Sequence, residues 1–229
     1  QSRYPFAIGI DPTDRDVGGT SVKKRELSKF ALVAVRKYNE GIEMQEGCAG
    51  TTFSPVMMYR HRSESVTDDF KEAAKCMIFL GSKAHIESNR GAALFKQLKD
   101  WGLEKMIRWR PDTTYKQNAK HNPVPGTPTS DDLYDLGIPM VNEWVTHHCT
   151  PENNPFIHFY VECQKLDRKD MQPFDIFVAF MFALFDSGGG ILAQPDKNKD
   201  IGGGDDWKPS AANNWKATGH HPDKYRIRR

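Results

Sequence analysis

Histidine and cysteine side chains are most concentrated in one short stretch of the chain, where His147, His148 and Cys149 are followed by His158 and Cys163. Imidazole nitrogens and thiolate sulfurs are the ligands that zinc prefers in proteins. A zinc-dependent hydrolase or nuclease that uses His147, His148 and Cys163 is therefore one hypothesis for function. The competing interpretation is a helix end followed by a half-buried strand, because the stretch lacks a Cys-x-x-Cys pair and residues five apart on a strand point to opposite faces.

Other catalytic signatures are absent or weak. Neither glycine triplet, at 188–190 or 202–204, is followed by the Gly-Lys-Ser/Thr of a phosphate-binding loop. No Gly-x-Ser-x-Gly sequence is present to carry a nucleophilic serine. Three pairs of adjacent acidic residues are typical of solvated turns and helix caps: Asp68-Asp69, Asp131-Asp132 and Asp205-Asp206. We therefore predict no catalytic residue and no cofactor, with zinc at the His/Cys stretch as the exception.

Composition limits the classes of protein to which the chain can belong. Its 229 residues are 38% hydrophobic and 27% charged, which suits one large or two small folded domains. The formal net charge is only +2, whereas a dedicated nucleic-acid binder usually has a strong basic excess. The longest apolar run, Ile176–Phe185, is too short to span a bilayer. We therefore expect neither a nucleic-acid partner nor a transmembrane segment.

The first residue is Gln1 rather than Met, so removal of a leader and truncation of the sequence are both open. The compartment is undetermined; removal of a leader would suit an organelle (mitochondrion or plastid) or secretion. The four cysteines are too few and too scattered for a disulfide framework, so two bridges and four buried thiols are equally open: Cys48, Cys76, Cys149 and Cys163.

Regular elements begin after an extended N-terminal segment over residues 1–20. An amphipathic helix is predicted over 21–40, because apolar residues recur there at spacings of three or four: Leu27, Phe30, Ala31, Ala34, Val35 and Tyr38. Thr51–Arg60 and Phe70–Leu80 flank a polar turn and predict an antiparallel hairpin. A short helix that ends at Gly102 completes an α+β unit over 21–109.

Residues 110–130 contain four prolines and predict a linker or a loop draped over a surface. A second unit, over 131–186, then begins with weak helices near 131–136 and 140–148, which Gly137 and Pro139 interrupt.

Two apolar runs, Phe156–Leu166 and 174–185, lie on either side of a polar turn and predict an antiparallel hairpin. The second run is apolar on both faces, so a central strand and a buried helix are equally compatible with it.

Residues 187–229 are rich in glycine and polar residues and cannot build a core. Aromatic and basic side chains recur along this segment, as in arms that dock on another protein: Trp207, Trp215, Tyr225, Arg226 and Arg228. We therefore predict an extended C-terminal arm that binds other protein subunits.

Several segments have counterparts in one known family. VGG at 17–19, ELSKFALVAVRKYNEG at 26–41 and GCAGTTF at 47–53 follow the order of the glycine segment, helix and first inhibitory loop of plant-type cystatins. FKEAAKCMIFL at 70–80 and FKQLKDW at 95–101 are similar to later segments of that family. The resemblance of residues 17–101 to cystatins implies a cystatin/monellin-like fold. It also implies inhibition of papain-like cysteine proteases through one exposed edge: Gly18, Gly19, Gly47, Cys48, Ala49 and Gly50.

Together these patterns predict an α+β protein in which an antiparallel sheet packs on the 21–40 helix. A helix-plus-hairpin unit and a C-terminal arm follow. The predicted function is that of a non-catalytic structural subunit, held in a larger multiprotein complex by the arm. The alternatives are the cystatin-like protease inhibitor and the zinc-dependent hydrolase or nuclease.

Overall fold

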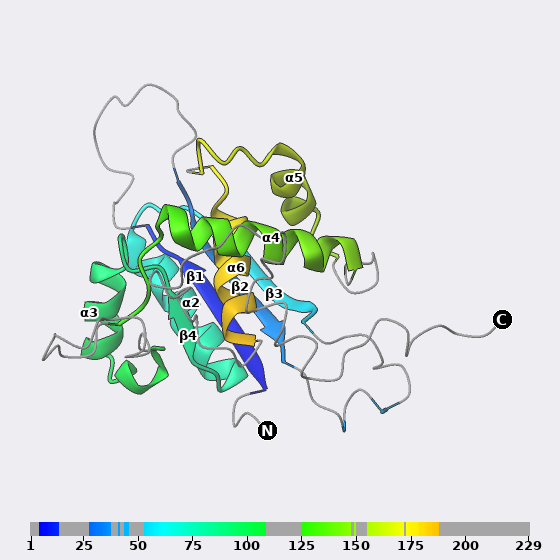
Figure 1. Ribbon diagram of the computed structural model, residues 1–229. Coiled ribbons are helices and arrows are strands. Elements are labelled where there is room, and N and C mark those ends of the chain that lie inside the picture. The colour runs from blue at the N-terminus through cyan, green and yellow to red at the C-terminus, as the bar shows by residue number, and fades with distance from the viewer. Residues whose placement is uncertain are drawn as a thin grey trace, which may run out of the picture.

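The structure, a computed structural model, describes residues 5–13, 28–37, 41, 44–45, 53–108, 125–147, 149, 155–171 and 173–187. The predicted α+β class is confirmed, because these residues form four strands and five α-helices (Figure 1). The strands are β1 (Phe6–Asp11), β2 (Phe30–Arg36), β3 (Pro55–His61) and β4 (Ala84–Ile86). The helices are α2 (Val66–Leu80), α3 (Ala92–Asp100), α4 (Asp131–His147), α5 (Ile157–Lys165) and α6 (Asp175–Ser187), with a short 3-10 turn, η1 (Glu104–Met106).

The sheet has the order β3-β2-β1-β4. Strands β1, β2 and β3 form an antiparallel meander, in which Ile8 pairs with Ala34 and Leu32 pairs with Tyr59. Strand β4 is parallel to β1, with Ile8 opposite Ala84. The sheet is therefore mixed rather than wholly antiparallel, because α2 carries the chain from β3 back to the other side of β1.

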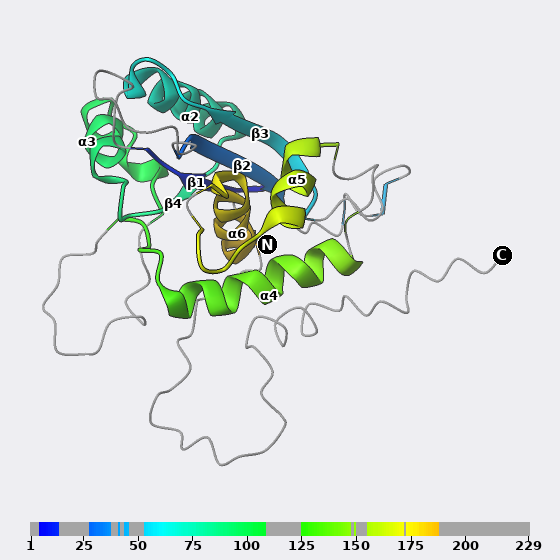
Figure 2. The same ribbon diagram turned by 90° about the horizontal axis from the view of Figure 1, so that it is seen from above.

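Helices cover both faces of the sheet (Figure 2). Ile8, Ile10 and Leu32 belong to a core that includes the buried residues of α2 and α3. Ala7 and Val33, which alternate with them along the strands, belong to a second core that includes α6 and, outside it, α4 and α5. Since side chains alternate across a strand, the position of a residue in β1 or β2 determines which core it joins.

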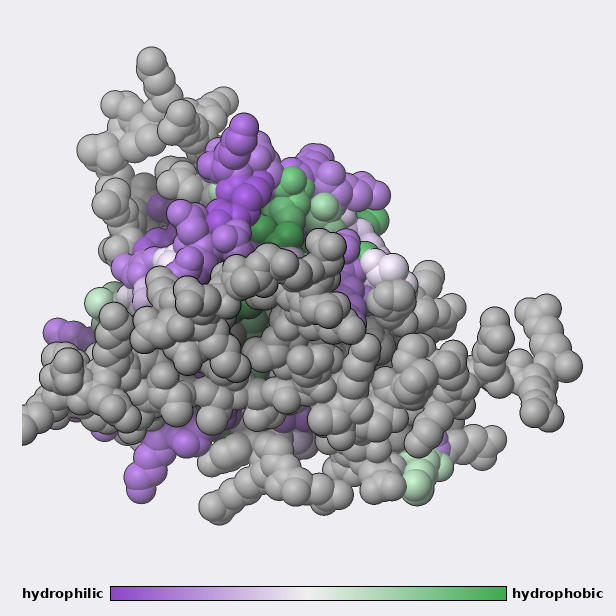
Figure 3. Space-filling view, in the orientation of Figure 1, coloured by the Kyte–Doolittle hydropathy of each residue, from purple (hydrophilic) through white to green (hydrophobic). Residues whose placement is uncertain are grey.

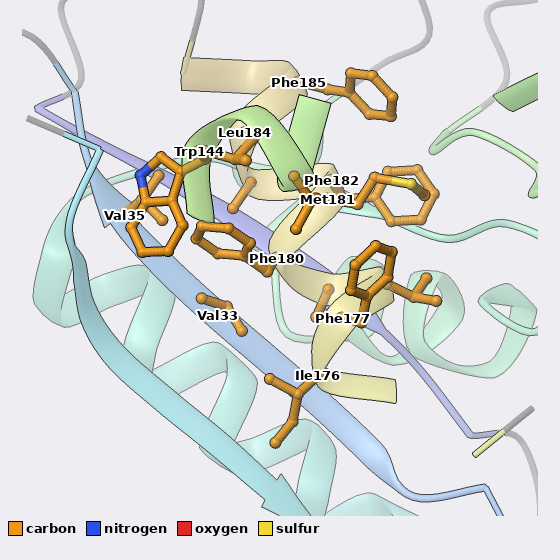
Figure 4. Packing of buried hydrophobic residues seen from close by; sticks show 14 of the residues in the cluster. Val33, Val35, Trp144, Ile176, Phe177, Phe180, Met181, Phe182, Leu184 and Phe185 are labelled. Atoms are coloured by element: carbon orange, nitrogen blue, oxygen red, sulfur yellow. The ribbon is translucent and has the colours of Figure 1, made fainter. Parts of the chain in front are cut away.

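Helix α6 is the centre of the second core. All of its residues are buried, since the sheet covers one side of the helix and α4 and α5 cover the other (Figure 4). Trp144 of α4 lies edge-on to Phe180 of α6, with ring centroids 4.7 Å apart. A helix that is apolar all round must be enclosed in this way.

Two glycines let helices approach closely. A Cβ atom on Gly9 of β1 would lie 1.9 Å from the carbonyl oxygen of Ala179 in α6. A Cβ atom on Gly137 of α4 would lie 2.0 Å from the sulfur of Met181. Helix α6 therefore lies directly on the backbone of β1, and α4 lies directly on α6.

Residues 30–36 form a strand, so the predicted 21–40 helix is wrong in this part. Every residue from Phe30 to Val35 is buried. A helix on a sheet buries one stripe, whereas a central strand buries both faces. The residues at spacings of three or four, which predicted the helix, are only some of the residues in a run that is apolar throughout.

Residues 66–80 form helix α2, so the strand predicted at Phe70–Leu80 and its hairpin are wrong. Asp68 and Asp69 lie in the first turn, where carboxylates suit the helix dipole. Gly81 follows the last turn at φ +58° and donates its N–H to the carbonyl of Ile78. This left-handed glycine is a common way to end a helix. The neighbouring strand prediction, Thr51–Arg60, is confirmed in its overlap with β3, and the short helix ending near Gly102 is confirmed as α3.

The region predicted as a helix-plus-hairpin unit contains three helices. Residues 131–147 form one continuous helix in spite of Pro139. Proline has no N–H to donate to the carbonyl of Asp135, but both residues lie on the exposed side of α4, where water can replace this hydrogen bond. The predicted hairpin of Phe156–Leu166 and 174–185 is wrong, since these runs form α5 and α6. All three helices belong to the core on the α6 face of the sheet.

Several predictions lie outside the described residues. They concern the C-terminal arm from 188 onward, most of the proline-rich 110–130 segment and the cystatin-like edge. Within the described part, Cys76, Cys149 and Cys163 form no disulfide with one another. No helix of this part has the length and apolar character needed to cross a membrane.

Candidate functional site: a buried carboxylate cluster

Acidic side chains gather where β1 and β4 end and α6 begins. Asp11 is the last residue of β1, and Glu87 follows β4 directly and donates its N–H to the carbonyl of Ile10 at 2.9 Å. Parallel neighbours bring their carboxyl ends to the same edge of a sheet, which is where α/β proteins commonly bind ligands. Asp175 is the first residue of α6, which approaches this edge from the second core.

Strand alternation places these residues on one face. Asp11 continues the series of Ala7 and Gly9, which face α6. Glu87 is two residues beyond His85, whose ring packs on Phe182 of α6 with centroids 4.8 Å apart. The carboxylates of β1 and of the β4 end therefore lie on the face that α6 covers.

The guanidinium group of Arg90 joins the first two carboxylates. Its Nη2 donates to Oδ1 of Asp11 at 2.9 Å, and its Nε lies 3.9 Å from Oε2 of Glu87. Glu87 is also held by Thr129, whose hydroxyl donates to Oε1 at 2.9 Å. Asp11 and Glu87 are each only 1% exposed, so neither carboxylate reaches bulk water.

Ser28 connects Arg90 to the third carboxylate. Nη1 of Arg90 donates to the Ser28 hydroxyl at 2.6 Å, and that hydroxyl donates to Oδ1 of Asp175 at 2.6 Å. The backbone N–H of Lys29 donates to the other oxygen of Asp175 at 3.0 Å. Three carboxylates from three elements thus converge on one guanidinium group.

A fourth carboxylate, Glu162 of α5, lies behind Asp175. Arg60 of β3 is shared between them, with Nη2 3.5 Å from Asp175 Oδ2 and Nε 3.4 Å from Glu162 Oε1. The N–H of Phe177, in the first turn of α6, donates to Glu162 Oε2 at 2.9 Å. Oε1 of Glu162 is buried and accepts no hydrogen bond from a described residue.

Negative charge exceeds positive charge in this cluster. Four buried carboxylates face two guanidinium groups, those of Arg60 and Arg90. Burial raises the pKa of Asp11 well above its usual value, and the neighbouring Asp175, Glu87 and Glu162 raise it further against the opposing effect of Arg90. Burial also raises the pKa of Asp175, and it raises the pKa of Glu162 to about 7. Burial is the largest cause of each elevation, as is typical of carboxylates held away from water.

A second buried charge cluster lies at the other end of α6. Asp186 contacts Nζ of Lys37 at 3.2 Å and Nε of Arg108 at 2.7 Å. Here one carboxylate faces two cations, so the protein supplies all the positive charge that the acid needs.

Helix α5 has two different sides. Glu162 points inward, whereas Ile157 and Val161 are 69% and 39% exposed. Figure 3 shows apolar surface in the region of α5, bordered by hydrophilic surface. The apolar side is a surface feature distinct from the carboxylate cluster.

The sites predicted from sequence are not those that the structure brings together. Cys163 lies on α5, where burial raises the pKa of its thiol to about 12, so the thiolate that zinc requires is disfavoured. His147 is the last residue of α4, and His148 lies outside the described residues. The docking residues of the arm lie outside them as well: Trp207, Trp215, Tyr225, Arg226 and Arg228. So do all six residues of the cystatin-like edge: Gly18, Gly19, Gly47, Cys48, Ala49 and Gly50.

The sequence analysis missed the carboxylate cluster, although it contains a signal. Asp11 directly follows the apolar run FAIGI, Glu87 follows His85-Ile86, and Asp175 opens the apolar run of α6. An acidic residue at the end of a buried segment is costly unless it has a role. The cluster could be recognised only by knowing that β1 pairs with β4, and the spacing of residues along the chain does not reveal this pairing.

No protein-family model matches the chain, and no curated protein or solved structure is significantly similar to it. Within the described ranges, no group of three or more His, Cys, Asp or Glu side chains could hold a metal ion. At the carboxylate cluster, the Arg90 guanidinium takes the central place.

Proposed function

We propose that the chain is a divalent-metal-dependent phosphodiesterase that hydrolyses nucleic acid, with Asp11, Glu87 and Asp175 as metal ligands. One observation carries this proposal. Two buried carboxylates, from β1 and the β4 end, contact Arg90 directly, and the carboxylate that opens α6 is linked to Arg90 through the Ser28 hydroxyl and contacts Arg60.

The surplus of buried negative charge supports a divalent cation. Burying an ionised carboxylate is unfavourable unless it is paired or binds a metal. A divalent ion would favour the ionised forms of these carboxylates, three of which have pKa values that burial raises. Carboxylate and hydroxyl oxygens are the ligands that Mg²⁺ and Mn²⁺ prefer, and Ser28 and Thr129 provide hydroxyls beside the carboxylates.

The arginines support a phosphate ester as substrate. Arg60 and Arg90 are 21% and 34% exposed at their side chains, so each combines a buried contact with access to solvent. Arg62, whose Nη1 donates to the carbonyl of Ser28 at 2.6 Å, lies at the same place. Guanidinium groups bind phosphate oxygens in bidentate fashion.

The proposed reaction is hydrolysis of a phosphodiester. Carboxylate-bound metals in nucleases lower the pKa of a water molecule and stabilise charge on the phosphoryl group. The water gives a proton to solvent as its oxygen bonds to phosphorus, the bond from phosphorus to the ester oxygen of the leaving strand breaks, and that oxygen takes up a proton from solvent. The basic groups are local to this edge, so the near-zero net charge of the whole chain does not oppose a nucleic-acid substrate.

The test is cleavage of supercoiled plasmid DNA and of single-stranded RNA with Mn²⁺ or Mg²⁺. Wild-type protein should cleave at least one of them, and Glu87→Gln should lower the rate by about 100-fold or more because it removes a metal ligand. The control is Glu72→Gln, which changes an exposed glutamate paired with Lys75 on α2. Chelation-resistant cleavage, or equal rates in wild type and Glu87→Gln, would contradict the proposal.

The structural-subunit and protease-inhibitor hypotheses depend mainly on residues outside the described part and stay predictions. Native mass measurement tests the first, and a papain inhibition assay tests the second.

A further inference from the structure

We propose that the surface formed by the last turns of α2 and α3 binds an anionic lipid bilayer, with Phe79 and Trp101 entering the headgroup region. This surface, which we call the α2–α3 end, comprises residues 75–83 and 99–105. It is separate from the carboxylate cluster, because it lies beside the start of β4, whereas Glu87 follows the end of that strand. The inference therefore goes beyond the proposed function and does not depend on it.

Helices α2 and α3 end at the same end of the sheet. Gly81 follows α2 and Gly102 follows α3, with φ angles of +58° and +73°. A few residues further along each segment, Ala84 forms a parallel bridge with Ile107, and the N–H of Arg108 donates to the carbonyl of Ala84 at 2.8 Å. Because the segments that follow the two glycines pair in this way, the last turns of both helices form one surface (Figure 1).

Large apolar side chains are exposed on the α2–α3 end. Phe79 is 79% exposed, its neighbour Ile78 is 59% exposed and Trp101 is 37% exposed. The turns beside them are open, since a Cβ atom on Gly81 or on Gly102 would have nothing within 4 Å. Exposed apolar side chains that gather in this way mark sites of contact with proteins or membranes.

Lysines accompany these apolar side chains. The α2–α3 end contains four lysines and two acidic residues: Lys75, Lys83, Lys99, Lys105, Asp100 and Glu104. Lys75 also pairs with Glu72 of the preceding turn at 2.6 Å, and the surface keeps a net positive charge when Glu72 is included. The α2–α3 end is therefore complementary in charge to an anionic partner.

This combination of side chains fits a lipid surface better than a protein partner. Protein interfaces are depleted in lysine, whereas protein surfaces that lie on membranes combine lysine with aromatic and aliphatic residues. Tryptophan prefers the headgroup level of a bilayer, phenylalanine buries apolar area at the acyl boundary, and ammonium groups attract anionic headgroups. Because the excess of positive charge is small, binding should require both the apolar side chains and the lysines.

The experiment is flotation of the full-length protein with vesicles of phosphatidylcholine, alone or mixed with phosphatidylserine. We expect wild type to float with the anionic vesicles and to bind phosphatidylcholine alone about 10-fold more weakly. Phe79→Ser should weaken binding to the anionic vesicles by about 10-fold, because it removes a side chain that enters the lipid. The double variant Lys99→Glu, Lys105→Glu should weaken it by a similar factor and reduce its dependence on salt.

Two matched control variants change helix α5. Ile157→Ser removes an exposed apolar side chain, and Lys165→Glu reverses an exposed charge in the last turn of that helix. Both should bind the anionic vesicles as wild type does. Phe79, Lys99 and Lys105 are exposed as well, so thermal unfolding should show that every variant keeps the stability of wild type.

Three outcomes would overturn the inference. The first is that wild type floats with neither kind of vesicle. The second is that Phe79→Ser binds as wild type does, or that Ile157→Ser weakens binding as much as Phe79→Ser. The third is that light scattering shows wild type as a dimer and Phe79→Ser as a monomer while neither floats, which would assign the surface to a second copy of the chain. None of these results bears on nucleic-acid cleavage, which is measured without lipid.

Discussion

The two ends of helix α6 both bury charge, and they balance it in opposite ways. At the C-terminal end one carboxylate, Asp186, contacts two cations, Lys37 and Arg108. At the N-terminal end four carboxylates share Arg60 and Arg90. The first arrangement has more cations than carboxylates and fastens the helix to the end of β2 and to the segment after η1. The second has a surplus of negative charge, which a bound cation would balance. The difference separates a structural ion cluster from a candidate functional one.

The largest effect on stability should come from a change that separates α6 from β1, because it would disrupt the charge clusters at both ends of α6. In Gly9→Ala the new Cβ would meet backbone atoms of Ala179 and Ala183 that cannot move aside. We expect a loss of about 4 kcal/mol or more in the free energy of unfolding, measured by urea denaturation. Gly102→Ala is the control: nothing lies within 4 Å of its Cβ, and only its φ of +73° opposes a side chain, at a cost of about 1 kcal/mol. Similar losses in the two variants would contradict the close packing of α6 on β1.

Neutralising one carboxylate at each end of α6 should affect the free energy of unfolding to different extents. Asp186→Asn leaves the buried Lys37 ammonium without its partner and should cost about 3 kcal/mol. Asp11→Asn relieves repulsion from Glu87 and Asp175, although it weakens the contact with Arg90. It should change the stability of the metal-free protein by less than about 1 kcal/mol or raise it. Calorimetric unfolding in the presence of EDTA measures both. A greater loss in Asp11→Asn than in Asp186→Asn would show that the N-terminal end is already balanced.

The pH dependence of stability should also differ between the ends. Burial raises the pKa of Glu162 from its ordinary 4.5 to about 7, against the opposing effects of the Phe177 N–H and of Arg60. Between these values the folded protein keeps a proton that the unfolded chain releases, so stability falls as pH rises from 4.5 to 7. Glu162→Gln should abolish a loss of about 2–3 kcal/mol over that window.

Burial lowers the pKa of His85, near Asp186, from 6.5 to about 4. Its Nε2 lies 2.8 Å from the hydroxyl of Thr127. Between pH 4 and 6.5 the unfolded chain binds the proton that folded His85 refuses, so stability rises with pH. His85→Gln should remove a gain of about 2–3 kcal/mol over this window. Urea midpoints measured from pH 4.5 to 8 test both variants against wild type. If the difference between wild type and variant changed with pH in the same direction for Glu162→Gln and His85→Gln, the proposed contrast between the two ends of α6 would be wrong.

The smallest effect is expected at an exposed ion pair on the surface of α4. Arg168 contacts Asp131 and Asp135 at 3.1 Å each, and both carboxylates are largely solvated. Arg168→Gln should leave the urea midpoint of unfolding almost unchanged, because exposed ion pairs contribute little to stability. A larger change would mean that surface pairs, too, contribute to the stability of the α4–α6 layer.

The α+β class could be predicted from sequence, but several elements could not. Phe30–Val35 is apolar at every position, and such a run fits one face of a helix as well as both faces of a central strand. Phe159 and Glu162 of α5 are buried at helical spacing, but the aromatic residues around them also suit a strand. The short helix that ends near Gly102 was predicted correctly, whereas α2, which Gly81 ends, was predicted as a strand.

The carboxylate cluster could not be predicted, because its members lie up to 164 residues apart and meet only through tertiary structure. Asp11 and Glu87 become neighbours when β4 pairs with β1, and Asp175 joins them when α6 packs on Gly9. Spacing along the chain favoured the His147, His148 and Cys163 group instead. Short-range spacing detects sites within one segment, and this site is built from the ends of several.

The most direct test of the metal-site account is anomalous diffraction at the manganese edge from crystals grown with Mn²⁺. The account predicts an anomalous peak bound by the carboxylates of Asp11, Glu87 and Asp175. A peak at His147 and Cys163, or none at the carboxylate cluster at saturating Mn²⁺, would contradict it.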